Sequence, residues 1–293
     1  MDAQTVQIIQ LAVNGISIGA IYSLVALGLV LSYKATEVLN FAHGDMLMLA
    51  AFTAWGLIAL AGLPFWAAAL ITIAAVALVS YLLERHIMRI IVGQPQFAGV
   101  MLTIGLAFMV RGAVSMGFGP ESRNYTTPWP GTSHLGGLVI ADLNVVIILA
   151  AVVITLALFR FLRRTRVGVA IQAASQNQLA AYLSGIRVKR LNSLVWGISG
   201  AIAAACGVLL APITLVDIGL WFVMLKAMAA LVVGGFGSVP GAILGGVVIG
   251  LVEQFSGVYG PEGFKNIAAY CLLIAVLIFY PRGILGEAHG RRV

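Results

Sequence analysis

The sequence predicts an all-α protein, a bundle of about eight or nine membrane-spanning helices. Its 293 residues are 61% hydrophobic and 9% charged, whereas soluble domains carry about 25% charged residues. The apolar residues also fall in long blocks without charge, and about 20 apolar residues in a helix cross a bilayer. The alternating pattern of a membrane β-barrel is missing. These observations exclude a soluble globule.

The expected spans follow from the order of the apolar stretches. We expect helices at about 6–32, 46–61, 65–83, 97–116, 143–161, 191–216, 221–233, 242–252 and 267–280. If the Gly-rich run 234–241 dips into the membrane and returns, the count is eight; otherwise it is nine. Together the spans form a single transmembrane domain over residues 1–293.

The positive charges orient this bundle. The net charge is +7, and most Lys and Arg residues lie in polar segments on one side of the spans, as in cytoplasmic loops. They gather at the junction Arg85/Arg89, in the segment 160–190 and in the tail (Arg282, Arg291 and Arg292). The loop 117–142 then faces outside, with the N-terminus outside and the C-terminus cytoplasmic. The positive net charge is therefore better explained by cytoplasmic loops of a protein in a lipid bilayer than by binding to a nucleic acid.

Small residues recur every fourth position, a pattern that lets helices approach closely in lipid. Two readings stay open: tight packing within this chain, or a subunit interface or pore lining. The recurring sets are Gly15/Gly19/Ser23, Gly241/Gly245 and Gly246/Gly250.

A first polar group interrupts the apolar blocks at Asn40, His43 and Asp45. Such side chains are costly in hydrocarbon and usually face a cavity, a partner or an interface. Gly44 marks a helix break, which membrane depth tolerates only where protein or water covers the backbone. Either this is a loop in which Asp45 caps the next helix, or the group lines a translocation path.

A second group lies in the polar segment 163–190. Ser175 and Gln178 fit a capping box at the start of a short helix over 176–184, and Gly185 suits the left-handed position after it. Another short helix is expected over 167–174. The helix either lies on lipid headgroups or docks a cytoplasmic partner. Its candidate docking residues are Ser175, Gln176, Asn177, Gln178, Leu179, Tyr182, Leu183 and Gly185.

Two charged residues lie in apolar stretches near the C-terminus. Lys226 and Glu253 either extend to a membrane interface or face a cavity on the translocation path. The run 234–241 (GGFGSVPG) is either a plain connecting loop or a re-entrant backbone.

Enzyme motifs are missing from the sequence. It has no GxxxxGK[ST] phosphate loop, no HExxH and no GxSxG. His43 with Asp45 makes no metal ligand set. We therefore expect no catalytic residue, no metal and no cofactor bound by this chain.

Five runs of the sequence form a recognisable set: 15–28 (GISIGAIYSLVALG), 39–45 (LNFAHGD), 166–186, 234–242 (GGFGSVPGA) and 280–286 (YPRGILG). In content and order they resemble one family, the bacterial branched-chain amino-acid ABC-importer permeases of the LivH type. The NFAHG signature is fairly specific, whereas the Gly-rich run is shared more widely among related permeases.

The resemblance implies a multi-pass subunit of a bacterial inner-membrane importer. Its partners would be a second, homologous permease in a heterodimer, two cytoplasmic ATPases that use ATP, and a periplasmic binding protein. The helix near 176–184 would be the coupling helix, seated in an ATPase groove.

Other functions remain as alternatives. Related permeases carry urea, short amides and other small solutes. A stand-alone carrier or channel would favour paired ionisable residues and an inverted repeat, and a membrane enzyme would need clustered acid, base or metal ligands. The sequence has few ionisable residues within its apolar stretches, no clear repeat, and no cluster beyond His43 with Asp45.

Overall fold

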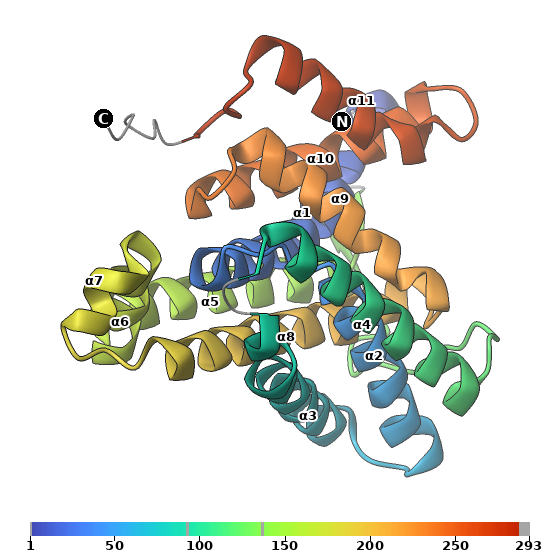
Figure 1. The fold of residues 1–293 in the computed structure, drawn as a ribbon. Coiled ribbons are helices and arrows are strands. Elements are labelled where there is room, and N and C mark those ends of the chain that lie inside the picture. Colours follow the sequence, from blue (N-terminus) through green and yellow to red (C-terminus); the bar gives the residue numbers. More distant parts are fainter. Residues whose placement is uncertain (1, 92–93, 136–137, 287–293) are drawn as a thin grey trace. The chain divides into compact units, whose positions relative to one another are not determined.

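The computed structural model describes residues 2–91, 94–135 and 138–286, and it is largely helical (Figure 1). Within these residues, seven helices are long and apolar enough to span a membrane, and two shorter apolar helices cover 218–234 and 264–279. All nine expected stretches are therefore helical, which confirms the helical bundle. Of the basic tail, Arg291 and Arg292 lie outside the described residues.

The chain divides into two compact units, which we describe separately. Unit one comprises Met1–Val30, Trp129–Ala151 and Val223–Val293. Its elements are α1 (Ala3–Thr36), β1 (Thr132–Leu135), β2 (Leu138–Ala141), α5 (Asp142–Arg164), α9 (Val223–Gly234), α10 (Val239–Tyr259) and α11 (Phe264–Phe279), of which α1 and α5 continue into unit two. The single domain expected from the sequence stays a prediction.

Helices α1 and α10 of unit one pack at very short range. A Cβ built on Gly19 would lie 2.8 Å from the Cα of Val247, and one built on Gly15 would lie 3.0 Å from the Cα of Leu251. Ser23 meets Gly246 in the same contact and donates a hydrogen bond to the carbonyl of Ile243 at 2.7 Å. These small residues therefore serve packing within this chain.

A tight turn joins α9 to α10. Gly235 and Gly237 take left-handed φ angles of 115° and 86°, which glycine adopts without strain. The Ser238 hydroxyl caps α10 by accepting from the Gly241 N–H at 3.1 Å. The tail pairs with the end of α9, because Ile284 and Leu285 donate to the carbonyls of residues 233 and 234 at 2.9 and 2.8 Å. The Gly-rich run therefore forms a tight turn between the two helices.

Unit two comprises Leu31–Pro128 and Val152–Phe222. Its elements are α2 (His43–Trp55), the π-helical turn η1 (Gly56–Leu60), α3 (Phe65–His86), the 3₁₀ turn η2 (Met88–Ile91), α4 (Gln96–Phe118), α6 (Arg166–Gln176), α7 (Gln178–Leu183), α8 (Val188–Thr214) and the 3₁₀ turn η3 (Ile218–Phe222). Helix α8 packs against both α2 and α3. Its Gly207 approaches the backbone of Leu47, and its Gly200 approaches Ser80.

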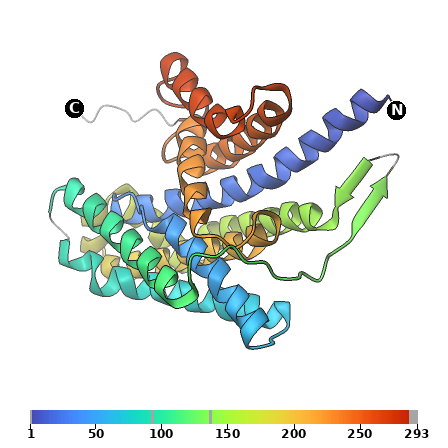
Figure 2. The same cartoon turned by 90° about the vertical axis from the view of Figure 1, so that its right-hand side faces the viewer.

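The loop 117–142 departs from the all-α expectation. Strands β1 and β2 pair antiparallel within it, with Thr132 opposite Ala141, directly before α5 (Figure 2). The sequence signal that we missed is the Gly136-Gly137 pair between two β-prone runs. In unit two the loop is anchored by Tyr125, whose hydroxyl donates to the carbonyl of Val208 at 2.6 Å. Burial raises the pKa of Tyr125.

Candidate functional site

The start of α2 holds the first predicted polar group. Asn40, His43 and Asp45 are all buried, and the structure brings them together around a helix break. Asn40 Oδ1 accepts from the Ala42 N–H at 3.1 Å, and Thr103 of α4 accepts from the Phe41 N–H at 3.2 Å. Neighbouring side chains therefore satisfy the broken backbone, as burial in a membrane protein requires.

Of the two alternatives for this group, the one in which Asp45 caps the helix is wrong. Helix α2 begins at His43 after Ala42, which makes no side-chain cap. Asp45 instead binds Arg111 of α4, whose Nε and Nη2 lie 3.0 and 3.2 Å from the two carboxylate oxygens. A bidentate charged pair holds the carboxylate more strongly than one backbone N–H does, which explains the correction.

Sequence reasoning missed Arg111. Its guanidinium also stacks on the ring of Trp221, with Cζ 4.0 Å from the ring centroid, and lies 5.3 Å from that of Phe108. Its side chain is 21% exposed, whereas that of Asp45 is 1% exposed. The sequence contains a signal for this residue, because Arg111 is the one charged residue in the apolar stretch 97–116 and such residues usually have a functional or structural partner.

His43 lies beside this pair on α2. Its Nδ1 is 3.3 Å from the hydroxyl of Ser199, while its buried Nε2 has no hydrogen-bond partner among the described residues. In the same part of the chain, no group of three His, Cys, Asp or Glu side chains is placed to hold a metal ion. The cluster at the start of α2 therefore combines a bidentate ion pair with one unsatisfied ring nitrogen.

The second polar pair lies in unit one. Lys226 of α9 and Glu253 of α10 contact each other, with Nζ 2.7 Å from Oε1. Their side chains are 16% and 5% exposed. The other carboxylate oxygen accepts from the Tyr22 hydroxyl of α1 at 2.6 Å. The two charges therefore meet inside the protein instead of extending separately to an interface, and Tyr22 is a partner that the sequence did not suggest.

The short helices α6 and α7 lie side by side in unit two (Figure 1). The predicted capping box at Ser175 is wrong: Ser175 lies within α6, and its hydroxyl donates to the carbonyl of Gln172 at 2.8 Å. The N-cap of α7 is Asn177, whose Oδ1 accepts from the Ala180 N–H at 3.0 Å. An Asn caps as well as a Ser does, and here the extended backbone falls at Asn177.

The C-terminus of α7 confirms the conformation expected for Gly185. Its φ is 84°, and its N–H donates to the carbonyl of Tyr182 at 3.0 Å. The Ile186 N–H donates to the carbonyl of Ala181 at 3.0 Å, which completes a Schellman motif. Both ends of this short helix are therefore fixed by local hydrogen bonds.

One face of α7 is anchored and another is exposed. Ala181 packs with Ala174 and Val188, and Gln178 Nε2 donates to the carbonyl of Ala35, in the last turn of α1, at 3.0 Å. Leu179, Tyr182 and Leu183 are 68%, 68% and 77% exposed. Their i, i+3, i+4 spacing makes one apolar stripe, which we call the α7 face.

The described residues form a helical bundle with buried ion pairs and a short capped helix, as expected of a multi-pass membrane protein. The fold is similar to that of PsaBC from Streptococcus pneumoniae, solved in complex with a Fab. That likeness has a TM-score of 0.51 at 13% identity and covers 92% of this chain and 91% of the other.

Sequence comparison is more specific. The chain belongs to the family described as branched-chain amino acid transport system / permease component, whose model matches residues 11–280. It is 31% identical to the branched-chain amino acid permease BraD of Pseudomonas aeruginosa, over 97% of this chain and 98% of BraD. It is 30% identical to LivH of Escherichia coli K12 over the full length of both. The resemblance seen in the sequence motifs is confirmed.

Proposed function

We propose that this chain is the permease subunit of an ABC importer that moves branched-chain or similar small amino acids across a bacterial inner membrane. The observation that supports this most is full-length similarity to BraD and LivH, both named as high-affinity branched-chain amino acid permeases. The basic segments 85–89 and 160–190 favour a cytoplasmic position for α6 and α7, with the N-terminus outside and the C-terminus inside.

The importer would work through partners. Two ATPase subunits bind and hydrolyse ATP, a periplasmic protein delivers the amino acid, and a second, homologous permease completes a heterodimer. The α7 face supports a docking role, because an exposed apolar stripe on a helix with two fixed ends presents a rigid contact. Its anchors to α8 and to the last turn of α1 give a route by which ATPase motion reaches the spans.

The two polar clusters are candidates for the translocation path. Asn40, His43 and Asp45, now with Arg111, form the first, and Lys226 with Glu253 forms the second. Ionisable residues within spans commonly mark substrate pathways. Of the two clusters, the first fits this role better, because Arg111 is more exposed than Lys226 and because His43 Nε2 has no partner in the part of the chain that the structure describes.

Reconstitution tests the proposal. The chain is inserted into proteoliposomes with its second permease and ATPases, and leucine uptake is measured with binding protein and ATP. We expect uptake to need both, and to compete with isoleucine and valine but not with urea or acetamide. Uptake driven by an ion gradient without ATP would overturn the importer assignment, and competition by urea alone would overturn the substrate class.

The coupling role has its own test. Tyr182→Ala with Leu183→Ala removes most of the α7 face and leaves both helix caps intact. We expect uptake to fall about tenfold, since about 1.4 kcal/mol of lost docking energy changes an equilibrium tenfold. Gly185→Pro should uncouple ATP hydrolysis from uptake, because proline cannot adopt a φ of 84°. Leu60→Ala, at an equally exposed side chain of η1, is the control. Normal coupled uptake in both α7 variants would remove the docking role.

A further inference from the structure

Three arginines converge on one cavity at the end of α3. Tyr81, Arg85, Arg89 and Arg190 line a space of about 410 Å³, which we call the arginine pocket. Arg89 is held in place, because its Nη2 donates to the carbonyl of Lys189 at 2.9 Å and to Ser193 Oγ at 3.0 Å. The pocket lies where α3 ends and α8 begins, at the ends of two candidate spans.

The charge of the arginine pocket is unbalanced. The nearest carboxylate to these arginines among the described ion pairs is Glu84, with Oε2 3.9 Å from Arg89 Nε. Glu84 is buried and also accepts a short hydrogen bond from Ser193. With the three arginines of the pocket set against one carboxylate, a surplus of about two positive charges remains. An anion would balance it.

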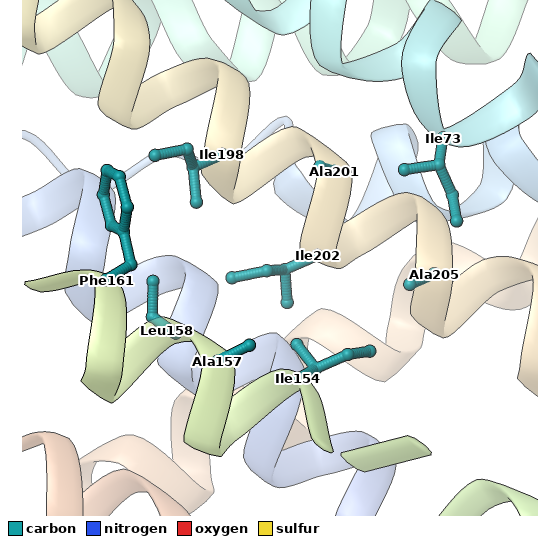
Figure 3. Close-up of a pocket in the computed structure, with 9 residues that line it drawn as sticks. All are labelled: Ile73, Ile154, Ala157, Leu158, Phe161, Ile198, Ala201, Ile202 and Ala205. Carbon is teal, nitrogen blue, oxygen red and sulfur yellow. The ribbon is translucent and has the colours of Figure 1, made fainter. Parts of the chain in front are cut away.

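A second cavity follows the same pair of helices. It has a volume of about 450 Å³, and Figure 3 shows its side chains reaching into the space between α5, α8 and α3. Every lining residue is apolar: Ile73, Ile154, Ala157, Leu158, Phe161, Ile198, Ala201, Ile202 and Ala205. We call it the apolar groove. It offers no hydrogen bond to a polar ligand.

The two cavities are aligned along α8. Arg190, Ile198, Ala201 and Ala205 are spaced by eight, three and four residues, which places them near one face of the helix. At about 1.5 Å per residue, Ile198 is about 12 Å and Ala205 about 22 Å beyond Arg190. Half of a bilayer's hydrocarbon core is about 15 Å thick. A charged head at Arg190 therefore places an acyl chain at the depth of the groove.

We propose that the arginine pocket and the apolar groove together form a binding site for one anionic phospholipid. The phosphate is bound by Arg85, Arg89 and Arg190, and one acyl chain lies between α3, α5 and α8. Basic pockets between helices at the cytoplasmic surface suit lipid phosphates, and guanidinium groups bind phosphate oxygens in pairs. An acidic peptide or free phosphate would use only the first cavity and leave the groove without an occupant.

Native mass spectrometry of the purified full-length chain tests this proposal. The delipidated chain is titrated in mild detergent with phosphatidylglycerol, and separately with phosphatidylcholine of the same acyl chains. We expect one phosphatidylglycerol retained per chain, at least about fivefold more than phosphatidylcholine. Arg85→Gln with Arg190→Gln should abolish this preference. Ala201→Phe, which fills the groove and keeps every charge, should reduce retention at least about fivefold.

Matched variants complete the experiment. Arg166→Gln removes an exposed arginine outside the pocket, and Leu156→Phe enlarges an exposed apolar side chain outside the groove. Both should retain lipid like the wild type. Equal retention in the arginine variants and in Arg166→Gln would overturn the proposal. So would unchanged retention in Ala201→Phe, or displacement of the lipid by inorganic phosphate alone, which would indicate a site for free anions.

Discussion

Two of the ion pairs within the candidate spans, Lys226–Glu253 and Asp45–Arg111, differ in how completely their hydrogen-bonding groups are used. Glu253 is shared by α1, α9 and α10, since Tyr22 and Lys226 each bind one of its oxygens. Asp45 binds one partner, Arg111, through both oxygens, and that partner also stacks on Trp221 and stays partly exposed. The first arrangement ties three helices together, and the second leaves some guanidinium N–H groups of Arg111 without a hydrogen-bond partner among the described residues.

This contrast suggests a division of roles. A carboxylate bound from two sides is hard to release without opening the contact between its helices, so Glu253 should matter most for stability. A guanidinium with spare donors can exchange partners while its helix stays in place. Asp45 and Arg111 should therefore matter most for transport. The following variants test the contrast, from the largest expected effect to the smallest.

Glu253→Ala should have the largest effect on stability. It leaves the Lys226 ammonium and the Tyr22 hydroxyl buried without their carboxylate, and removing one partner of a buried pair costs about 3–5 kcal/mol. The free energy of unfolding is measured in mild detergent by titration with SDS. Glu253→Leu combined with Lys226→Met should recover at least half of the loss. A loss below 1 kcal/mol for Glu253→Ala would contradict the structural role.

Arg111→Lys keeps the charge but loses the bidentate geometry and the flat stacking surface. We expect about 2 kcal/mol of lost stability, the typical value for one hydrogen bond to a charged group. Leucine uptake in proteoliposomes should fall by more than the loss of folded protein explains. Uptake divided by the amount of folded protein measures this difference. Lys226→Arg is the comparison variant in the other pair. Uptake that is proportional to the amount of folded protein in both variants would contradict the division of roles.

Tyr22→Phe removes one of the two groups that bind Glu253. Because Lys226 still neutralises the carboxylate, we expect about 1.5 kcal/mol of lost stability and little change in uptake per folded molecule. The same SDS titration and uptake assay measure both quantities. Tyr125→Phe, which loses a hydrogen bond to the carbonyl of Val208 instead, is the control outside the spans. A loss of transport without a loss of stability would place Tyr22 on the path.

Trp221→Phe gives the smallest expected effect. The guanidinium of Arg111 would keep an aromatic neighbour, but the face of a phenyl ring attracts a cation less strongly than the face of an indole ring. We therefore expect about 0.5–1 kcal/mol of lost stability. Trp66→Phe, at an exposed tryptophan on α3, provides the baseline for the change in side-chain volume. If the two variants lose equal stability, stacking on Trp221 contributes nothing to the position of Arg111.

The sequence predicted the helices better than it predicted the contacts. Long apolar blocks locate spans because lipid allows few other structures, and left-handed glycines such as Gly185 reveal where a helix ends. Partner choice depends on distances between helices, which spacing within one helix does not encode. For this reason the sequence indicated Asn40, His43, Asp45, Lys226 and Glu253 as polar residues in apolar surroundings, but it did not indicate their partners Arg111 and Tyr22.

The error at Ser175 has a physical cause in the backbone. A cap needs an extended backbone at its own position, and local sequence places that position only within a few residues. Asn177 has that backbone and Ser175 does not. The β1–β2 pair was missed because two strands of four residues each leave only a weak composition signal.

The pairing of the tail with α9 has a consequence for biosynthesis. The carbonyls of residues 233 and 234 receive their partners from Ile284 and Leu285, which are synthesised about fifty residues later, after α10 and α11. Until those two residues are made, the end of α9 must use water for these hydrogen bonds. Unit one is therefore completed by a segment that follows α11, and deleting residues 284 and 285 should leave the end of α9 frayed.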